Sequence, residues 1–425
     1  MDYVHSQPVA LFVIGTRPEA IKLAPLIYEL KKPDSTIRPV IVSTGQHRSM
    51  LLETLSVLGC DVDYDLAIMR PRQTLEHITT EVIQALPKIF KATIPRAVIV
   101  QGDTTSAFAA ALSAFYNNIP LYHVEAGLRT GNLKAPYPEE ANRALIARVA
   151  NLHFAPTEKA KHNLLAENIN PELIHVTGNT IIDAFKLFAS LPVPEFNSAL
   201  KKVLHSGKKI VLVTCHRRET TGLAQRRIAR ALAELADSHK HVEIIFPLHK
   251  NPAVRENFCS ELKNCSRVHL IDPLPYHQLV HVIKSSYLIL TDSGGIQEEA
   301  CACGVPTGIL REETERTEGI KAGVACRLGT DPHQIISWCE SLLKSPEKYA
   351  RYNKSSNCYG DGLAAKRIIS IILQQPEFNP ASETEIVLTD YRFDLPQYRA
   401  GQEDHRKEQE SNEVQAETSD RLISH

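Results

Sequence analysis

The sequence has almost no net charge, few cysteines and no long hydrophobic run. Its 425 residues carry 48 Lys and Arg against 49 Asp and Glu, which gives a formal net charge of −1. This balance argues against a large basic field, so we expect no nucleic-acid partner. The nine cysteines are too few for a disulfide scaffold, and the close pair Cys301 and Cys303 has no second pair or histidine cluster beside it. We therefore expect free thiols and no metal site.

Targeting and membrane signals are missing as well. The apolar run 9–14 is short and has no Lys or Arg before it, so it does not match a signal peptide. No stretch approaches the roughly 20 apolar residues that a membrane span needs. We expect a cytoplasmic protein with no membrane partner.

The pattern that is present is an alternation of short apolar runs with longer helix-like stretches. With 43% hydrophobic and 23% charged residues, the composition is that of a globular protein, and the length suggests two or three domains at roughly 150 residues each. Near-continuous apolar strands between helices indicate parallel sheets covered on both faces. An interruption at 187–209 divides the pattern, so we predict an α/β protein with two Rossmann-like, doubly wound domains. The expected strands are 10–15, 39–44, 97–102, 121–125, 152–155, 210–214, 243–248, 268–272, 287–291 and 306–310.

The last part of the chain differs in character. From about Pro376 onward, and above all over the last 25 residues, acidic side chains dominate and aliphatic ones are few. Such a segment buries too little apolar surface to offset its ordering entropy, so we predict a disordered tail over 376–425.

Two strand-to-helix loops have the features of anion sites. The loop after the first strand carries Arg17, with Lys22 one turn further on, and a helix N-terminus with an Arg fork suits phosphate or carboxylate. The alternative is an Arg that only caps a surface loop. In the second loop, 291–299, Ser293 can cap the helix and two glycines allow a diphosphate to approach the backbone. Glu299 could then accept hydrogen bonds from both ribose hydroxyls; the glycines are Gly294 and Gly295.

Neither loop is a P-loop, and no G-x-G-x-x-G occurs in the chain. These absences argue against ATPase, kinase and nicotinamide-dependent functions. A nucleotide held by its diphosphate is the favoured interpretation, and a Ser-capped helix with packing glycines is the structural alternative.

Three carboxylates lie at strand ends or in the loops just after them: Asp103, Glu125 and Glu139. Carboxylates placed together in this way can push their pKa values apart, which gives a proton-transfer enzyme one acid and one base. The alternative is that each pairs with Arg129, Arg143 or a helix N-terminus. His216 follows the first strand of the second half beside Arg217, which suggests a contact to phosphate or a leaving group. His249 repeats that arrangement one strand later.

Taken together, these segments resemble the non-hydrolysing UDP-N-acetylglucosamine 2-epimerases. The resemblance runs in order over about residues 8–375. The segments that carry it are 15–20 (GTRPEA), 101–105 (QGDTT), 123–130 (HVEAGLRT), 138–143 (PEEANR), 177–180 (TGNT), 216–219 (HRRE), 292–299 (DSGGIQEE), 314–316 (TER) and 359–362 (YGDG).

The resemblance implies a GT-B type fold, with two Rossmann-like domains facing across a cleft. It places an N-terminal domain at 1–178 and a UDP-binding domain at 179–362. A helix at about 363–375 would pack back on the first domain. The family interconverts UDP-N-acetylglucosamine and UDP-N-acetylmannosamine by anti elimination of UDP to 2-acetamidoglucal and syn re-addition. A UDP-sugar substrate, no cofactor and a homodimer follow as expectations.

Residue roles carried over from the family stay within its matching motifs. Asp103, Glu125 and Glu139 would be the acid and base groups, with His216 at the departing UDP. The substrate-binding positions would be Arg17, Lys22, Ser293, Gly294, Gly295, Glu299 and Arg316.

Some family members are activated by a second substrate molecule. The corresponding positions here are Gln46, Arg72, Glu139, Arg217 and His249, whereas Ser49 stands where regulated members usually have Gln. Elsewhere, Thr317, Lys250 and Cys358 replace the usual Pro, Leu and Pro. Two alternatives remain open: a C2 epimerase of a modified UDP-sugar such as a diacetamido uronic acid, and a UDP-sugar glycosyltransferase on the same fold.

Overall fold

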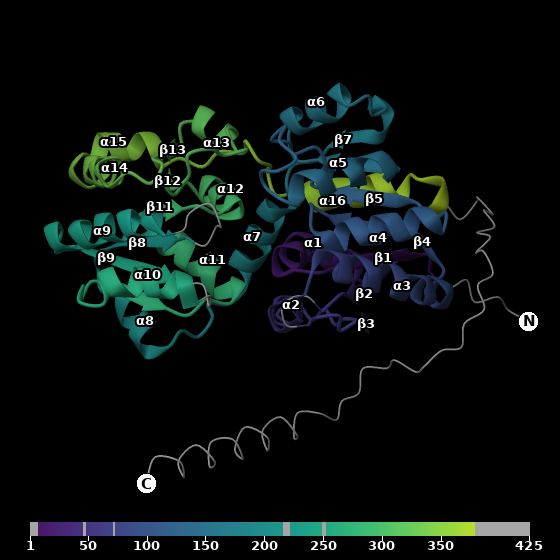
Figure 1. The fold of residues 1–425 in the computed structure, drawn as a ribbon, viewed down its shortest axis with the longest axis horizontal. Helices are drawn as coiled ribbons and strands as arrows, with labels where there is room; N and C mark the ends of the chain where they lie inside the picture. The colour runs from purple at the N-terminus through teal and green to yellow at the C-terminus, as the bar shows by residue number, and fades with distance from the viewer. Residues whose placement is uncertain (1–6, 46–47, 71–72, 216–221, 249–251, 379–425) are drawn as a thin grey trace, which may run out of the picture.

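The computed structural model describes residues 7–45, 48–70, 73–215, 222–248 and 252–378. These residues form two lobes, each built on one parallel sheet (Figure 1). The expected α/β class with two parallel sheets is confirmed. Across the described residues, no helix combines the length and apolar character needed to cross a membrane.

The first sheet has seven parallel strands. In spatial order they are β3 (Tyr64–Asp65), β2 (Arg38–Ser43), β1 (Val9–Ile14), β4 (Pro95–Gln101), β5 (Leu121–Val124), β6 (Leu152–Ala155) and β7 (Ile174–Val176). β1 pairs with β2 on one side and β4 on the other, so the winding direction reverses between β1 and β4. Ligands of open α/β sheets bind at the carboxyl ends of the strands beside such a switch point.

The second sheet repeats the plan with six parallel strands. In spatial order they are β10 (Val268–Ile271), β9 (Val242–Pro247), β8 (Lys209–Thr214), β11 (Leu288–Thr291), β12 (Thr307–Ile309) and β13 (Ala325–Arg327). Here the switch point lies between β8 and β11, because β8 pairs with β9 on one side and β11 on the other. Segment 292–295 directly follows β11 and therefore begins at this switch point.

The helices begin and end at recognisable sequence signals. Thr74, for example, accepts a hydrogen bond from the backbone of His77 at the start of α3, and Gly304 ends α12 with a left-handed φ of 77°. The helices are α1 (Arg17–Leu30), α2 (Arg48–Ser56), α3 (Leu75–Thr93), α4 (Thr105–Tyr116), α5 (Glu139–Val149), α6 (Glu158–Ala166), η1 (Pro171–Leu173), α7 (Thr180–Ser190), α8 (Ser198–Leu204), α9 (Leu223–Ser238), α10 (Pro252–Leu262), α11 (Tyr276–Ser285), α12 (Gly294–Cys303), α13 (Glu318–Lys321), α14 (Pro332–Lys344), α15 (Pro346–Tyr352), α16 (Ala364–Leu373) and η2 (Pro376–Phe378).

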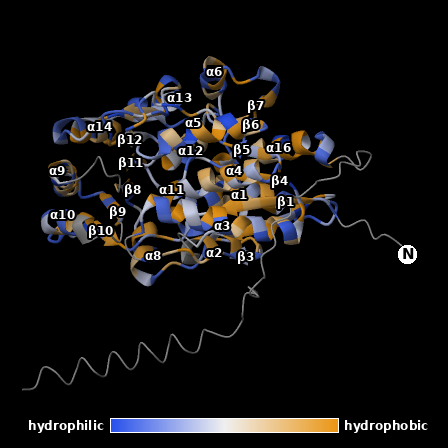
Figure 2. Ribbon diagram, turned by 45° about the vertical axis from the view of Figure 1, so that its right-hand side comes forward, coloured by the Kyte–Doolittle hydropathy of each residue, from blue (hydrophilic) through white to orange (hydrophobic). Residues whose placement is uncertain are grey.

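Each sheet has a hydrophobic core on both faces. Along β1, every residue is buried, and alternate side chains enter two different clusters. Leu11 packs with α3 and α4 residues, whereas Phe12 packs with α1 residues on the opposite face. Full burial of one such side chain contributes roughly 1.5–3 kcal/mol. Figure 2 shows the corresponding hydrophobic colour on β1 and α1.

The chain passes between the lobes twice, and the two crossings touch. The backbone N–H of Asn179 donates to the carbonyl of Tyr359 at 2.7 Å. A side chain on Gly178 would begin 3.2 Å from the Cα of Gly360, so both glycines permit the close approach. The predicted boundaries at 178 and 362 stay predictions, whereas the strands themselves span 9–176 and 209–327.

After the second crossing, the chain returns to the first lobe. α16 lies beside that lobe in Figure 1 and buries Ile368 and Ile372 in its core. Residues 376–378, expected to begin the tail, instead form η2 and bury Phe378 in the same core. The prediction that the tail starts at 376 is therefore wrong, because burial of the apolar Phe378 side chain holds residues 376–378 against the core. The rest of the predicted tail, 379–425, lies outside the described residues.

Candidate active site

The loop after β1 is fixed by a buried carboxylate. Glu19 accepts hydrogen bonds from the backbone of Gly15 at 3.1 Å and of Thr16 at 2.6 Å, and from the hydroxyl of Thr104 at 2.8 Å. Burial raises the pKa of Glu19 to about 7. Glu19 thus ties the loops after β1 and β4 together on both sides of the first switch point.

Arg17 reaches the second lobe. Its guanidinium Nη2 donates to the backbone carbonyl of Leu274 at 2.7 Å. Burial lowers the pKa of Arg17, while Glu53, Tyr276 and Glu299 act in the opposite direction. The residue lies where the two lobes meet, and its contact with a phosphate stays a prediction.

Glu125 is held by cations from both lobes. Its Oε2 accepts hydrogen bonds from the ammonium of Lys22 and from the amide of Gln101, the latter at 2.7 Å. Its Oε1 lies 3.4 Å from Nη2 of Arg316. Glu125 is 7% exposed and has a φ of 63°, a left-handed conformation that non-glycine residues seldom adopt. Such strain is typical of functional sites, because the surrounding contacts must hold it in place.

Arg316 is the centre of a buried charge cluster. Besides Glu125, its guanidinium contacts Glu298, with Nε–Oε1 at 2.8 Å, and Glu315. Its backbone carbonyl accepts a hydrogen bond at 3.0 Å from the hydroxyl of Tyr359, the residue at the second crossing. Three carboxylates thus surround one buried guanidinium, and two further cations balance them: Lys22 on Glu125 and Arg311 on Glu315, the latter at 3.1 Å.

Glu298 connects this cluster to the first crossing. Its Oε2 accepts a hydrogen bond from the side-chain amide of Asn179 at 2.7 Å. Burial raises the pKa of Glu298 to about 7, although Arg316 favours its charged form. A chain of buried contacts therefore runs from Asn179 through Glu298 and Arg316 to Glu125.

The two glycines at the start of α12 have different surroundings. A Cβ on Gly294 would lie 2.5 Å from Cζ of Arg316, whereas a Cβ on Gly295 would meet no atom within 4 Å. Gly294 therefore makes room for the arginine, and Gly295 faces open space where an anion could approach the helix N-terminus. Ser293 is the N-cap residue, but its side chain accepts no capping hydrogen bond, which corrects the expectation that it caps the helix.

Glu299 lies in the interior with a tyrosine partner. The hydroxyl of Tyr276, the first residue of α11, donates to its Oε1 at 2.5 Å. Burial raises the pKa of Glu299 to about 7, while the hydrogen bond from Tyr276 lowers it. The predicted contact between Glu299 and ribose hydroxyls stays a prediction.

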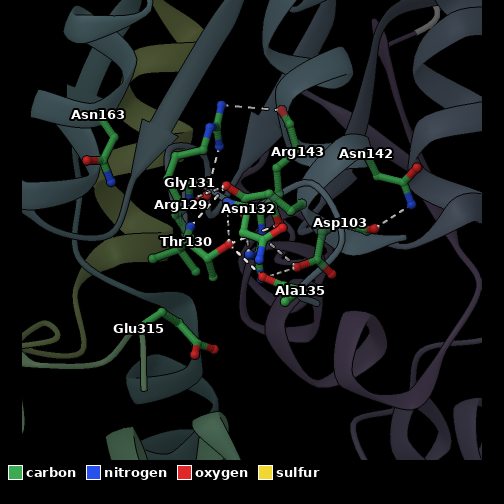
Figure 3. Close-up of polar contacts among 12 residues, drawn as sticks. Asp103, Arg129, Thr130, Gly131, Asn132, Ala135, Asn142, Arg143, Asn163 and Glu315 are labelled. Atoms are coloured by element: carbon green, nitrogen blue, oxygen red, sulfur yellow. Dashed lines mark hydrogen bonds and ion pairs between the residues drawn. The ribbon is translucent and has the colours of Figure 1, made fainter. Parts of the chain in front are cut away.

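Asp103, in the loop after β4, is paired with an arginine of α5. Its Oδ2 accepts hydrogen bonds from Arg143, with Nε at 2.8 Å and Nη2 at 2.6 Å. The side chain of Asn142 donates to its backbone carbonyl at 2.8 Å, as Figure 3 shows. The structural alternative for Asp103, pairing with Arg143, is therefore realised, yet a quarter of its side chain stays exposed.

The loop 129–135 lies beside this pair and is fastened to α5 (Figure 3). The carboxylate of Glu140 accepts hydrogen bonds from the backbone of Thr130 at 3.0 Å and of Gly131 at 2.9 Å, and it also pairs with Arg143. Glu139, its neighbour, is half-buried, and its Oε2 has no hydrogen-bond partner among the described residues. A buried carboxylate oxygen without a partner is suited to a ligand or a transferable proton.

The chain matches the model of a known family. The family model described as UDP-N-acetylglucosamine 2-epimerase matches residues 29–373. The chain belongs to the UDP-N-acetylglucosamine 2-epimerase family. The family resemblance drawn from the sequence motifs is thereby confirmed.

Relatives in this family align with the chain over nearly their whole length. The UDP-N-acetylglucosamine 2-epimerase of Neisseria meningitidis serogroup A is 44% identical over 370 residues, which are 86% of this chain and 99% of that protein. The Escherichia coli K12 epimerase is 43% identical over 367 residues, with 85% and 97% covered. The crystal structure of the Neisseria meningitidis epimerase bound to UDP-GlcNAc superposes with a TM-score of 0.80 and 42% identity, covering 86% of this chain and 100% of that one. The GT-B type fold is confirmed by this likeness.

Several predicted positions of the epimerase family site lie outside the described residues. They are His216, Arg217, Gln46, Arg72 and His249. Among the described residues, no group of three or more His, Cys, Asp or Glu side chains could hold a metal ion. For the chain as a whole, the absence of a metal site stays a prediction.

Other residues of the site carried no predicted role. Gln101, Asn179 and Glu298 stand inside the epimerase family motifs, so their motif membership was a usable signal. Tyr276 has no such signal, because its contact with Glu299 joins two helices that no local pattern relates.

Proposed function

We propose that the protein interconverts UDP-N-acetylglucosamine and UDP-N-acetylmannosamine by reversible epimerisation at C2. The observation that carries the proposal is the placement of Glu125, a strained, buried carboxylate between Lys22 and Arg316 where the two lobes meet. Family membership supports the same reaction, since the relatives named above are UDP-N-acetylglucosamine 2-epimerases.

The proposed reaction is anti elimination of UDP to 2-acetamidoglucal, followed by syn re-addition. The C2 proton is not acidic, so its removal must be coupled to loss of the C1 leaving group. This coupling requires a carboxylate base at the sugar and cations at the diphosphate. Glu125, Asp103 and Glu139 would supply the carboxylates, and Lys22 donates a hydrogen bond to Glu125. Elimination and re-addition cause no net oxidation, so the proposal requires no nicotinamide.

The diphosphate would lie at the start of α12. Gly295 leaves space there, and the helix N-terminus favours negative charge. Arg316 lies next to Gly294, but its guanidinium contacts three carboxylates. We infer that Arg316 exchanges one of these carboxylates for phosphate when substrate binds. The carboxylate contact at 3.4 Å, with Glu125, is the longest of the three and the one we expect to open.

Incubation with UDP-N-acetylglucosamine in deuterated water tests the proposal. Proton NMR should show loss of the C2 hydrogen signal and growth of the manno epimer. Absence of exchange, with a known epimerase active on the same substrate, would contradict it. Exchange only with a diacetamido uronic acid substrate would favour the modified-sugar alternative, and sugar transfer without C2 exchange would favour a glycosyltransferase.

We infer three further properties from membership of the family. The product would supply activated N-acetylmannosamine for cell-surface polysaccharide synthesis. The protein would act in the cytoplasm and as a homodimer. Size-exclusion chromatography with light scattering tests the last of these, since a monomeric mass at working concentration would contradict it.

A further inference from the structure

Two cysteine thiols are in contact beside the second crossing between the lobes. Cys301 lies near the end of α12, and Cys358 directly precedes Tyr359; their Sγ atoms are 3.3 Å apart. The backbone N–H of Ser356 also donates to the carbonyl of Cys301 at 3.1 Å. The two segments are thus joined by the backbone as well as by the thiols, so the contact does not depend on a flexible side chain alone.

The two thiols differ in exposure and in acidity. Cys301 is 2% exposed, whereas Cys358 is half-buried and lines a pocket of about 550 Å³ together with Lys159 and Arg367. A hydrogen bond from Cys301 lowers the pKa of Cys358, and the same contact, together with burial, raises the pKa of Cys301. The thiolate is the reactive form of cysteine, so a small oxidant entering the pocket would react first with Cys358.

We propose that Cys301 and Cys358 form a reversible oxidation site that responds to hydroperoxides. The Cys358 thiolate attacks one peroxide oxygen, the O–O bond breaks, and Cys358 becomes a sulfenic acid. The Cys301 sulfur then attacks the sulfenic sulfur, its proton leaves with the departing hydroxide as water, and an S–S bond forms. For hydrogen peroxide, two thiols lose two electrons and one peroxide becomes two waters. A dithiol reverses the reaction by exchange.

The disulfide would act on the proposed active site through both of its cysteines. Cys301 lies one turn after Glu298 on α12. The hydroxyl of Tyr359, next to Cys358, donates a hydrogen bond to the carbonyl of Arg316 and accepts one from the backbone N–H of Gly319. Because an S–S bond measures about 2.05 Å, oxidation brings the sulfurs roughly 1 Å closer than in the thiol pair.

This movement would shift Arg316 and Glu298 relative to one another and slow turnover. A misplacement of about 1 Å at reacting groups can cost roughly 100-fold, so we expect a loss on the order of tenfold. This regulatory part rests on the proposed function, whereas formation of the disulfide does not.

The test compares the wild-type protein with Cys358→Ser, Cys301→Ser and the matched control Cys303→Ser, which removes a thiol from the same helix. Each full-length protein is treated with hydrogen peroxide, alkylated and digested for peptide mass spectrometry, and its C2 exchange rate is measured before oxidation, after it and after dithiothreitol. We expect a peptide linking Cys301 and Cys358, and a reversible loss of rate, in the wild type and Cys303→Ser. Cys358→Ser and Cys301→Ser should keep the unoxidised rate under peroxide.

Two results would overturn the proposal. Peroxide treatment without a linkage between Cys301 and Cys358 would remove the oxidation site, whatever the activity. A complete linkage that leaves the exchange rate unchanged would remove the regulatory part. A protein that forms the linkage but has no exchange activity when reduced would contradict the proposed function alone.

Discussion

Nη2 of Arg316 lies 3.4 Å from Oε1 of Glu125, so one contact joins an arginine of the second lobe to a strained carboxylate of the first. Lys22 holds the other oxygen of that carboxylate. Removal of one partner from a buried charge cluster leaves the others uncompensated, at a cost of about 3–5 kcal/mol. Variants at this proposed catalytic contact must therefore be tested for stability as well as for activity.

The first prediction concerns the carboxylates. Glu125→Gln and Asp103→Asn should each lower turnover by about 10²–10⁴, the usual contribution of general acid–base catalysis, while UDP binding persists. C2 exchange by NMR and UDP titration by calorimetry measure the two effects. Glu172→Gln, on the exposed surface of η1, is the matched control and should behave as wild type. Near-normal rates in both carboxylate variants would show that the site assignment is wrong.

The second prediction separates the two glycines of α12. In Gly294→Ala, the new methyl would overlap Arg316, so we expect a loss of about 1–3 kcal/mol in stability. In Gly295→Ala, the methyl meets no protein atom, and alanine favours a helix by about 1 kcal/mol, so Tm should hold or rise. UDP affinity should nevertheless fall about tenfold or more, because the methyl lies where we place the diphosphate. Equal effects of the two changes on both Tm and affinity would contradict these separate roles.

The third prediction is a pH dependence centred on Glu299. Burial raises its pKa from 4.5 to about 7, and Glu298 adds to the increase, whereas Tyr276, Lys22 and Arg17 act against it. Because Glu299 holds its proton more tightly in the folded state than in the unfolded state, the free energy of unfolding of the protein decreases as the pH rises from 4.5 through 7.

Glu299→Gln should remove this part of the dependence. Relative to wild type, the free energy of unfolding of the variant should increase by on the order of 3 kcal/mol between about pH 4.5 and about pH 8. Urea denaturation across this range measures the difference. Parallel pH curves for the two proteins would contradict the raised pKa.

The fourth prediction concerns the end of the chain. Deletion of residues 381–425 should leave Tm and turnover nearly unchanged, because that segment has little apolar surface to bury. Deletion of 376–425 should cost roughly 3–5 kcal/mol, because it also removes Phe378 from the core beside Tyr122. Thermal unfolding of both truncated proteins makes the comparison, and a similar loss in each would show that the acidic segment has a structural role.

All ten expected strands occur, but three short strands were missed. They are β3, β7 and β13, each at the edge of its sheet. An edge strand is paired on one side only, so it needs no long apolar run, and two or three residues such as Tyr64 and Asp65 give no periodic signal. Central strands such as β1 are buried on both faces, and their continuous apolar sequence makes them predictable.

Sequence motifs pointed to residues that the fold brings together: Glu125, Lys22 and Arg316 lie in the same buried cluster. Their roles in binding and catalysis, like that of Glu299, stay predictions. The hydrogen-bond partners of these side chains were harder to predict. The pairing of Glu299 with Tyr276 depends on how two helices pack, and the sequence around either residue does not indicate that packing.

The contact between Gly178 and Gly360 has a mechanical consequence. Since both passages of the chain meet there, this point can serve as a pivot for a change in the angle between the lobes. A bulky side chain at either glycine would push the two passages apart and change the angle between the lobes. The resulting displacement would increase with distance from the pivot. It would reach Glu125 and Arg316, which lie in different lobes, although neither residue touches the introduced side chain.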